Sequence, residues 1–168
     1  MERPKVVITG MGAVTPLGIG AQNFWDQLIR GKSGVGPMTL CDPSPFPCQI
    51  AGEATEFDPL NYIDLKESRR MARFSQLAVA AALEAINSAN LVITPHNAHR
   101  VGVLFGNGNG GFPTTEDGCR TLVERGGMKI SPFFMPMILP NMAASNVSRR
   151  FGCTGYNSTV IKIGRAHV

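Results

Sequence analysis

Two short apolar runs, each followed by a glycine-rich turn, constrain the fold of this chain most strongly. The first run, residues 6–8, leads into Gly10 and Gly12, and the second, residues 100–105, opens into the glycine-rich segment 106–111. Runs of this kind are typical of strands that end in tight turns. Helical patterns follow both, and strands that alternate with helices favour an α/β fold with right-handed crossovers.

Helical periodicity predicts four helices. An apolar face at 24–29 predicts the first, and alanines along one face of 65–89 predict a longer, buried helix that permits close packing. Later helices are expected over 114–125 and 138–151, each ending at a glycine. Between the first two helices, residues 34–62 are rich in proline, glycine, aspartate and serine, which predicts an irregular excursion.

The composition is that of one globular domain, with 168 residues of which 43% are hydrophobic and 17% charged. Its apolar runs are far shorter than the roughly 20 residues of a membrane span, and the N-terminus lacks the apolar region of a signal peptide. We therefore expect a cytoplasmic protein without membrane contact. The formal charge of +4 is mild, which argues against nucleic-acid binding and is compatible with an acidic protein partner.

The glycine motifs have a nucleotide-binding alternative. Gly10-x-Gly12-x-x-Thr15 lacks the third Gly or Ala of a dinucleotide fingerprint, and Pro16 would disturb the expected helix start. Segment 106–111 is not followed by the Gly-Lys-Ser/Thr of a P-loop. Tight turns inside the fold are the favoured interpretation.

Cysteines and histidines do not form a metal-binding pattern. The four cysteines show neither CxxC spacing nor a compact framework, which predicts reduced thiols. His96 and His99 have no third ligand nearby and are expected to be solvated turn residues. We expect no metal and no cofactor.

Basic residues recur at helical spacing near the start of the long predicted helix. Lys66, Arg69, Arg70 and Arg73 follow each other at i, i+3, i+4 and i+7, so on one continuous helix they would form a positive stripe. Spacing alone favours a solvated face over a docking surface, because charged helix faces are common.

Four segments, taken in order, carry a resemblance to a known family. They are residues 6–18 (Val-Val-Ile-Thr-Gly-Met-Gly-Ala-Val-Thr-Pro-Leu-Gly), 66–71 (Lys-Glu-Ser-Arg-Arg-Met), 129–136 (Lys-Ile-Ser-Pro-Phe-Phe-Met-Pro) and 141–142 (Asn-Met). Together they resemble the β-ketoacyl-[acyl-carrier-protein] synthases, most of all the type II, elongating enzymes of fatty acid synthesis. The resemblance runs without a break from about residue 5 to residue 160.

The resemblance implies a thiolase-like α/β fold, in which two similar halves are stacked in αβαβα layers. This chain would hold an incomplete first half, and the full-length protein would be a homodimer. The implied reaction is a decarboxylative Claisen condensation. A cysteine takes an acyl chain from acyl carrier protein, and malonyl-acyl carrier protein then loses CO₂ and attacks this thioester to give 3-oxoacyl-acyl carrier protein. The cysteine needs a lowered pKa and the oxyanion needs backbone N–H donors.

The resemblance also implies roles for particular residues. Contacts with the acidic acyl carrier protein are implied for Lys66, Arg69, Arg70 and Lys129. A lining of the acyl pocket near the dimer interface is implied for Asn109, Phe133 and Phe134. Asn109 departs from the apolar residue that elongating enzymes usually carry, which would suit a shorter or oxygenated chain, or a polyketide-type or otherwise specialised synthase.

The catalytic cysteine is the missing part of the family's pattern. By register it falls at position 164, where this chain has Gly164, and the family's two histidines and lysine would lie beyond the chain. Residues 161–168 keep nothing of the expected Ser/Ala-Thr-Ala-Cys turn, and Ile-Gly-Arg-Ala-His-Val is what a common short-read sequencing adapter encodes. We therefore interpret 1–160 as a partial N-terminal synthase domain and 161–168 as a non-native tail. Cys153 precedes the last expected strand and is expected to be a buried thiol, not a substitute nucleophile.

The chain as given is thus expected to be inactive alone. The rival interpretation is a non-catalytic partner similar to the chain-length factors, which lack the cysteine. Such partners usually change only the cysteine position, whereas this sequence departs from the family over consecutive residues, so truncation is favoured.

Overall fold

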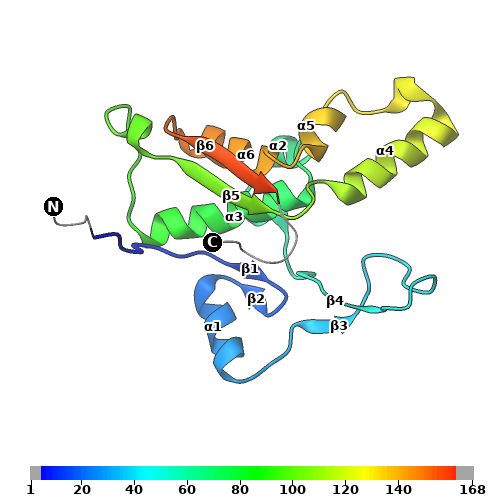
Figure 1. The fold of residues 1–168 in the computed structure, drawn as a ribbon, viewed down its shortest axis with the longest axis horizontal. Coiled ribbons are helices and arrows are strands. Elements are labelled where there is room, and N and C mark those ends of the chain that lie inside the picture. Colours follow the sequence, from blue (N-terminus) through cyan, green and yellow to red (C-terminus); the bar gives the residue numbers. More distant parts are fainter. Residues whose placement is uncertain (1–4, 162–168) are drawn as a thin grey trace. The chain divides into compact units, whose positions relative to one another are not determined.

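The computed structural model describes residues 5–161. The chain divides into two compact units, here called unit 1 (Met1–Asp58 with Ala80–Leu91) and unit 2 (Pro59–Val79 with Val92–Val168). The elements of Figure 1, with η for 3₁₀ helices, are in chain order β1 (Val14–Thr15), β2 (Gly18–Ile19), α1 (Ala21–Ile29), β3 (Val35–Pro37), β4 (Ile50–Gly52), η1 (Pro59–Asn61), α2 (Leu65–Ser68), α3 (Arg73–Ser88), η2 (Ala98–Arg100), β5 (Val103–Asn107), α4 (Phe112–Arg125), η3 (Gly127–Lys129), α5 (Phe134–Ile138), α6 (Met142–Phe151) and β6 (Asn157–Ile161).

Unit 1 holds two small hairpins and helix α1. Strand β1 pairs with β2 and strand β3 with β4, both antiparallel. Glu84, in the part of α3 that belongs to unit 1, accepts hydrogen bonds from the backbone N–H groups of Ala13 (2.9 Å) and Ala21 (2.7 Å). Hydrogen bonds to an ionised carboxylate are stronger than neutral ones, so Glu84 fastens the β1 segment and the start of α1 to α3.

Gly10 and Gly12 bring the N-terminal segment directly against α3. A Cβ atom on Gly12 would overlap the carbonyl oxygen of Ala81, and one on Gly10 would overlap that of Ala85. Only a backbone without a side chain can approach a helix this closely. The first glycine motif is therefore a packing feature of unit 1, and the tight turn expected at Gly10 and Gly12 is wrong. The alanines of α3 permit the contact, as expected from their spacing.

Unit 2 is built on two parallel strands and helix α6. The pairing of β5 with β6 runs from Val103↔Asn157 to Asn107↔Ile161, and α6 packs against both strands. The Asn157 side-chain amide donates a hydrogen bond to the Ala144 carbonyl (3.2 Å), which ties β6 to α6. Parallel strands whose connection runs through helices agree with the expected α/β class.

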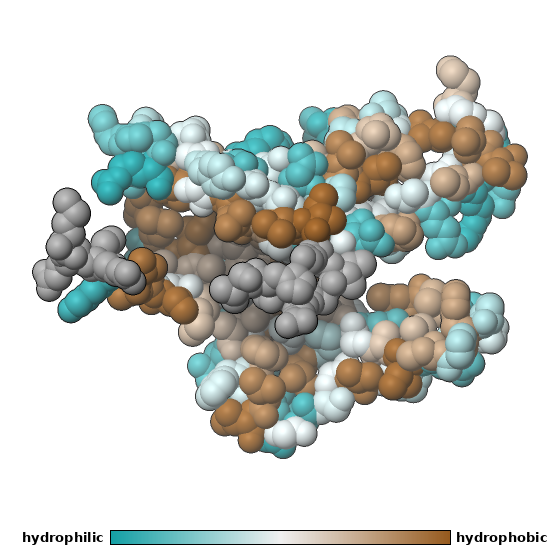
Figure 2. All heavy atoms as spheres, in the orientation of Figure 1, coloured by the Kyte–Doolittle hydropathy of each residue, from teal (hydrophilic) through white to brown (hydrophobic). Residues whose placement is uncertain are grey.

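The buried core lies mainly in unit 2. Its buried apolar side chains are Ile63, Met71, Ala72, Ala78, Val79, Ala98, Val103, Ala143, Ala144, Val147 and Cys153. Among the described residues of unit 1 the buried apolar side chains are Phe57 and Ala80, and α1 contributes none. The apolar face predicted at 24–29 is present but uncovered, and Figure 2 shows apolar residues exposed on the visible surface.

The continuous helix expected over 65–89 is wrong, because the chain turns between α2 and α3. The Gln76 side chain donates hydrogen bonds to the carbonyls of Ser68 (3.0 Å) and Met71 (3.2 Å) at this turn, which satisfies acceptors that a helix end leaves open. The turn also buries both Met71 and Ala72, each 3% exposed. Tertiary burial therefore overrides the helical periodicity.

Other boundaries differ in smaller ways. Residues 34–62 contain the β3–β4 hairpin, which their composition concealed. Helix α4 begins two residues before its expected start at 114, because Pro113 suits a first helical turn, where its missing N–H has no helical partner. The helix expected over 138–151 begins only at Met142, as α6, and the separate short helix α5 ends at Ile138. Pro140 lies between them and cannot continue a helical hydrogen-bond pattern.

Residues 6–8 do not form the expected strand. Val6, Val7 and Ile8 are 93%, 73% and 84% exposed, and no strand within residues 5–161 pairs with them. A strand requires a hydrogen-bonded neighbour, so the β-branched composition alone cannot create one.

Candidate functional site

Three of the predicted carrier-binding residues surround α2 in unit 2. Lys66 lies on the helix, Arg69 is its C-cap and Arg70 follows, and all three are exposed. Asp64 caps the N-terminus by accepting a hydrogen bond from the Glu67 backbone N–H (3.0 Å), and this bond lowers the pKa of the Asp64 carboxyl. Because α2 is only four residues long, the cations do not form the single helical stripe expected from their spacing.

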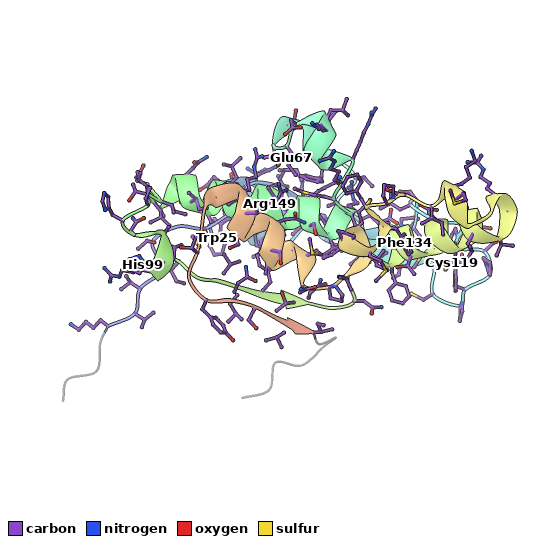
Figure 3. All side chains as sticks on the ribbon, turned by 90° about the horizontal axis from the view of Figure 1, so that it is seen from above. Trp25, Glu67, His99, Cys119, Phe134 and Arg149 are labelled. Carbon is purple, nitrogen blue, oxygen red and sulfur yellow. The ribbon has the colours of Figure 1, made fainter. Side chains whose placement is uncertain are left out.

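Two arginines at the end of α6, which no sequence pattern singled out, also meet α2. One Arg150 Nη atom lies 2.7 Å from Glu67 Oε2, and the other donates a hydrogen bond to the Tyr62 carbonyl (3.0 Å). Arg149 lies 3.4 Å from Glu67 Oε1. Figure 3 labels Glu67 and Arg149 on these two helices. The α2 surface therefore contains cations from two distant parts of the chain.

Arg70 also connects the two predicted sets of site residues. Its guanidinium carbon lies 4.4 Å from the centroid of the Phe133 ring. A guanidinium over an aromatic face is attracted by the ring quadrupole, at an exposed site by about 0.5–1 kcal/mol. A residue expected to bind the carrier thus contacts one expected to lie near the acyl pocket.

Phe134 and Lys129 line the same cavity in unit 2. The Phe134 ring lies so close to α4 that a Cβ atom on Gly118 would overlap it. Beside this contact is a cavity of about 220 Å³, whose lining includes Lys129, Gly118 and Phe134. Gly118 is therefore the residue that admits the Phe134 ring, a role that no sequence pattern indicated.

Asn109 lies apart from these contacts, exposed in the loop after β5. The loop is held by Asn107, whose side-chain amide donates to the Pro140 carbonyl (2.7 Å) and whose side-chain oxygen accepts from the Gly110 N–H (3.2 Å). Asn109 does not line the cavity beside Phe134. Its assignment to an acyl pocket stays a prediction.

Cys153 is buried, as expected, with 7% of its surface exposed. Burial raises the pKa of its thiol, which disfavours the thiolate needed for nucleophilic attack. The other cysteines are free and exposed. Gly164, the position of the expected nucleophile, lies in the segment 162–168 outside the described residues.

The described part of the chain contains no group of three or more His, Cys, Asp or Glu side chains that could hold a metal ion. None of the helices within residues 5–161 is both long and apolar enough to span a bilayer.

Comparison with solved structures supports the fold class. A structure described as the ishigamide ketosynthase/chain length factor is 25% identical with a TM-score of 0.78, over 92% of this chain and 39% of that one. A second, described as a type II PKS acyl-carrier protein in complex with its ketosynthase bound to the hexaketide, is 22% identical with a TM-score of 0.71, over 90% of this chain and 40% of that one. The second shows likeness of fold alone.

Comparison with protein sequences identifies the family. The 3-oxoacyl-[acyl-carrier-protein] synthase 2 of Synechocystis sp. is 41% identical over 96% of this chain and 39% of its own length, so this chain spans about two fifths of that relative. The family model described as beta-ketoacyl synthase, N-terminal domain, matches residues 3–161. The chain therefore belongs to the β-ketoacyl synthase family, with the thiolase-like fold that its sequence resemblance implied.

Proposed function

We propose that this chain is the N-terminal part of an elongating 3-oxoacyl-[acyl-carrier-protein] synthase. The full-length enzyme would condense an acyl thioester with malonyl-acyl carrier protein, with loss of CO₂. The 41% identity to a relative of that name, over nearly the whole chain, carries the proposal. Residues 1–168 alone would be inactive, because the expected nucleophile position is occupied by Gly164.

The proposed partner is an acidic acyl carrier protein. The full-length enzyme that binds it would be a homodimer in the cytoplasm. Lys66, Arg69 and Arg70 present positive charge around α2, and Lys129 adds charge beside Phe134. Opposite charges on two partners raise their rate of encounter and fix their relative orientation. Asn109, Phe133 and Phe134 are the proposed residues of the acyl pocket.

The proposed boundary between family sequence and non-native tail lies at residue 160. Sequencing the source DNA downstream of the Val160 codon tests it. We expect a continuation that encodes Thr-Ala-Cys, whereas an intact gene that encodes residues 163–168 and then stops would contradict the proposal.

The activity is tested with the full-length enzyme encoded by that continuation. Acyl- and malonyl-acyl carrier protein are expected to yield CO₂ and 3-oxoacyl-acyl carrier protein, measured by mass spectrometry of the carrier. A variant without the nucleophilic cysteine is the control. A full-length protein that lacks this cysteine and forms no product would instead support the chain-length-factor alternative.

Charge reversal at Lys66 is expected to weaken carrier binding. In the full-length enzyme, Lys66→Glu should raise KM for malonyl-acyl carrier protein about tenfold and change kcat much less, since a rim charge acts mainly on encounter. The effect should shrink as ionic strength rises, because salt screens exposed charges. Arg100→Glu, on an exposed arginine of η2, is the matched charge reversal, and an equal rise in KM for both variants would contradict a specific role for Lys66.

Replacement of Asn109 is expected to change chain-length preference. Asn109→Leu should raise kcat/KM for longer relative to shorter acyl chains, by about fourfold for each additional buried methylene, or ~0.8 kcal/mol. Asn109→Ala removes the amide without adding comparable apolar surface and is the control. Identical chain-length profiles for all three enzymes would remove Asn109 from the acyl pocket.

A further inference from the structure

The surface around α2 owes most of its net charge to α6. The segment of α2 carries three cations, Lys66, Arg69 and Arg70, and two carboxylates, those of Asp64 and Glu67, which leaves a formal charge of +1. Arg149 and Arg150 raise this charge to +3. An acidic partner therefore meets a strongly positive surface only when the end of α6 is included.

Arg150 and Arg149 differ in how they contribute. The Arg150 side chain is 28% exposed, as is that of Glu67, and their 2.7 Å ion pair joins residues 83 positions apart. With its second bond to the Tyr62 carbonyl, Arg150 holds α2 against α6 and neutralises a carboxylate that would repel an acidic partner. The Arg149 side chain is 63% exposed, so it remains accessible to a partner although it lies 3.4 Å from Glu67.

We propose that the end of α6 is part of the docking surface for acyl carrier protein, with Arg149 as a contact residue and Arg150 as the positioning residue for α2. This inference rests on the proposed function, since it names further residues of the same carrier-binding site. The two arginines act on an acidic partner in different ways, because one attracts it directly and the other removes a repulsion.

Binding of acyl carrier protein to the full-length enzyme, measured at low and moderate salt, tests this inference. Arg149→Ala is expected to raise Kd about fivefold at low salt and less at moderate salt. Arg150→Met, which leaves the Glu67 carboxylate with only its longer contact to Arg149, should raise Kd about tenfold. Addition of Glu67→Gln to Arg150→Met should restore most of the affinity, a recovery that a merely structural role of Arg150 would not produce.

Arg100→Ala is the matched control, because it also removes one exposed positive charge, but from η2, which is not part of the α2 surface. It should leave Kd unchanged. A Kd that is the same for Arg149→Ala and the wild type would overturn the inference, as would a raised Kd of Arg150→Met that Glu67→Gln does not lower. Either result would leave the proposed function intact. A wild-type enzyme that does not bind the carrier would overturn both.

Discussion

Residues 1–168, expressed alone, are expected to be poorly soluble and to show no cooperative thermal transition. On α1, Trp25 and Ile29 are 55% and 62% exposed. On the β5–β6 sheet, Leu104 and Val160 are 67% and 54% exposed and lie on the face opposite the Val103 side chain, which is buried. Large uncovered apolar surface drives association, and unpaired strand edges offer backbone groups to other chains.

Three measurements on the purified chain test this expectation. Size-exclusion chromatography should give aggregates, calorimetry should give no sharp unfolding peak, and a dye that binds exposed apolar surface should fluoresce strongly. The full-length enzyme is the control and should behave as a compact particle under the same conditions. A soluble monomer of residues 1–168 with a sharp transition would show that the units are stable without further covering.

Replacement of Gly12 by alanine is expected to destabilise the full-length enzyme by about 3 kcal/mol or more. The new Cβ atom would overlap the carbonyl oxygen of Ala81 and lie 2.8 Å from the Ala85 nitrogen. Both are backbone atoms of α3, so relief requires movement of the helix or of the segment before β1. Overpacking against backbone in a filled interior costs about 1–3 kcal/mol and occasionally more.

The matched control is Gly36→Ala in strand β3. No atom lies within 4 Å of a Cβ built there, and Gly36 does not have a positive φ. This variant should change the free energy of unfolding by less than about 1 kcal/mol, with a small gain from the stiffer unfolded chain. Thermal unfolding midpoints of the two variants test the prediction, and Gly12→Ala should have the lower one. Equal midpoints would contradict the close approach of Gly12 to α3.

Signals confined to a few neighbouring residues predicted their structures well. Helices α4 and α6 end at Gly126 and Gly152, with φ of +82° and +72°. Glycine adopts this region freely, so the end of a helix is encoded by one residue. The run at 100–105 predicts β5, displaced by a few residues. The strand predicted at 6–8 does not form, because a strand must pair with a neighbouring strand, and the local sequence does not specify that neighbour.

The resemblance proposed residues for the candidate site but could not give their contacts. The resemblance named Arg70 and Phe133 for different roles, and the structure places one over the other. Arg150 carried no motif, since its contacts with Glu67 and Tyr62, 83 and 88 positions away, give it its role. A basic residue in the last turn of a helix is ordinarily explained by the helix dipole alone.

The sequence by itself determined the α/β class and the ends of α4 and α6, because periodicity and turn chemistry are set within a few residues. Its resemblance to known enzymes, and not periodicity, determined the family. Only the tertiary structure decided that the helix expected over 65–89 breaks after Ser68, where Gln76 binds the open carbonyls. It also decided that α6 supplies cations to the α2 surface. The helix break and the shared surface both depend on which distant groups are buried together. The free energy of that burial is gained only when the chain packs.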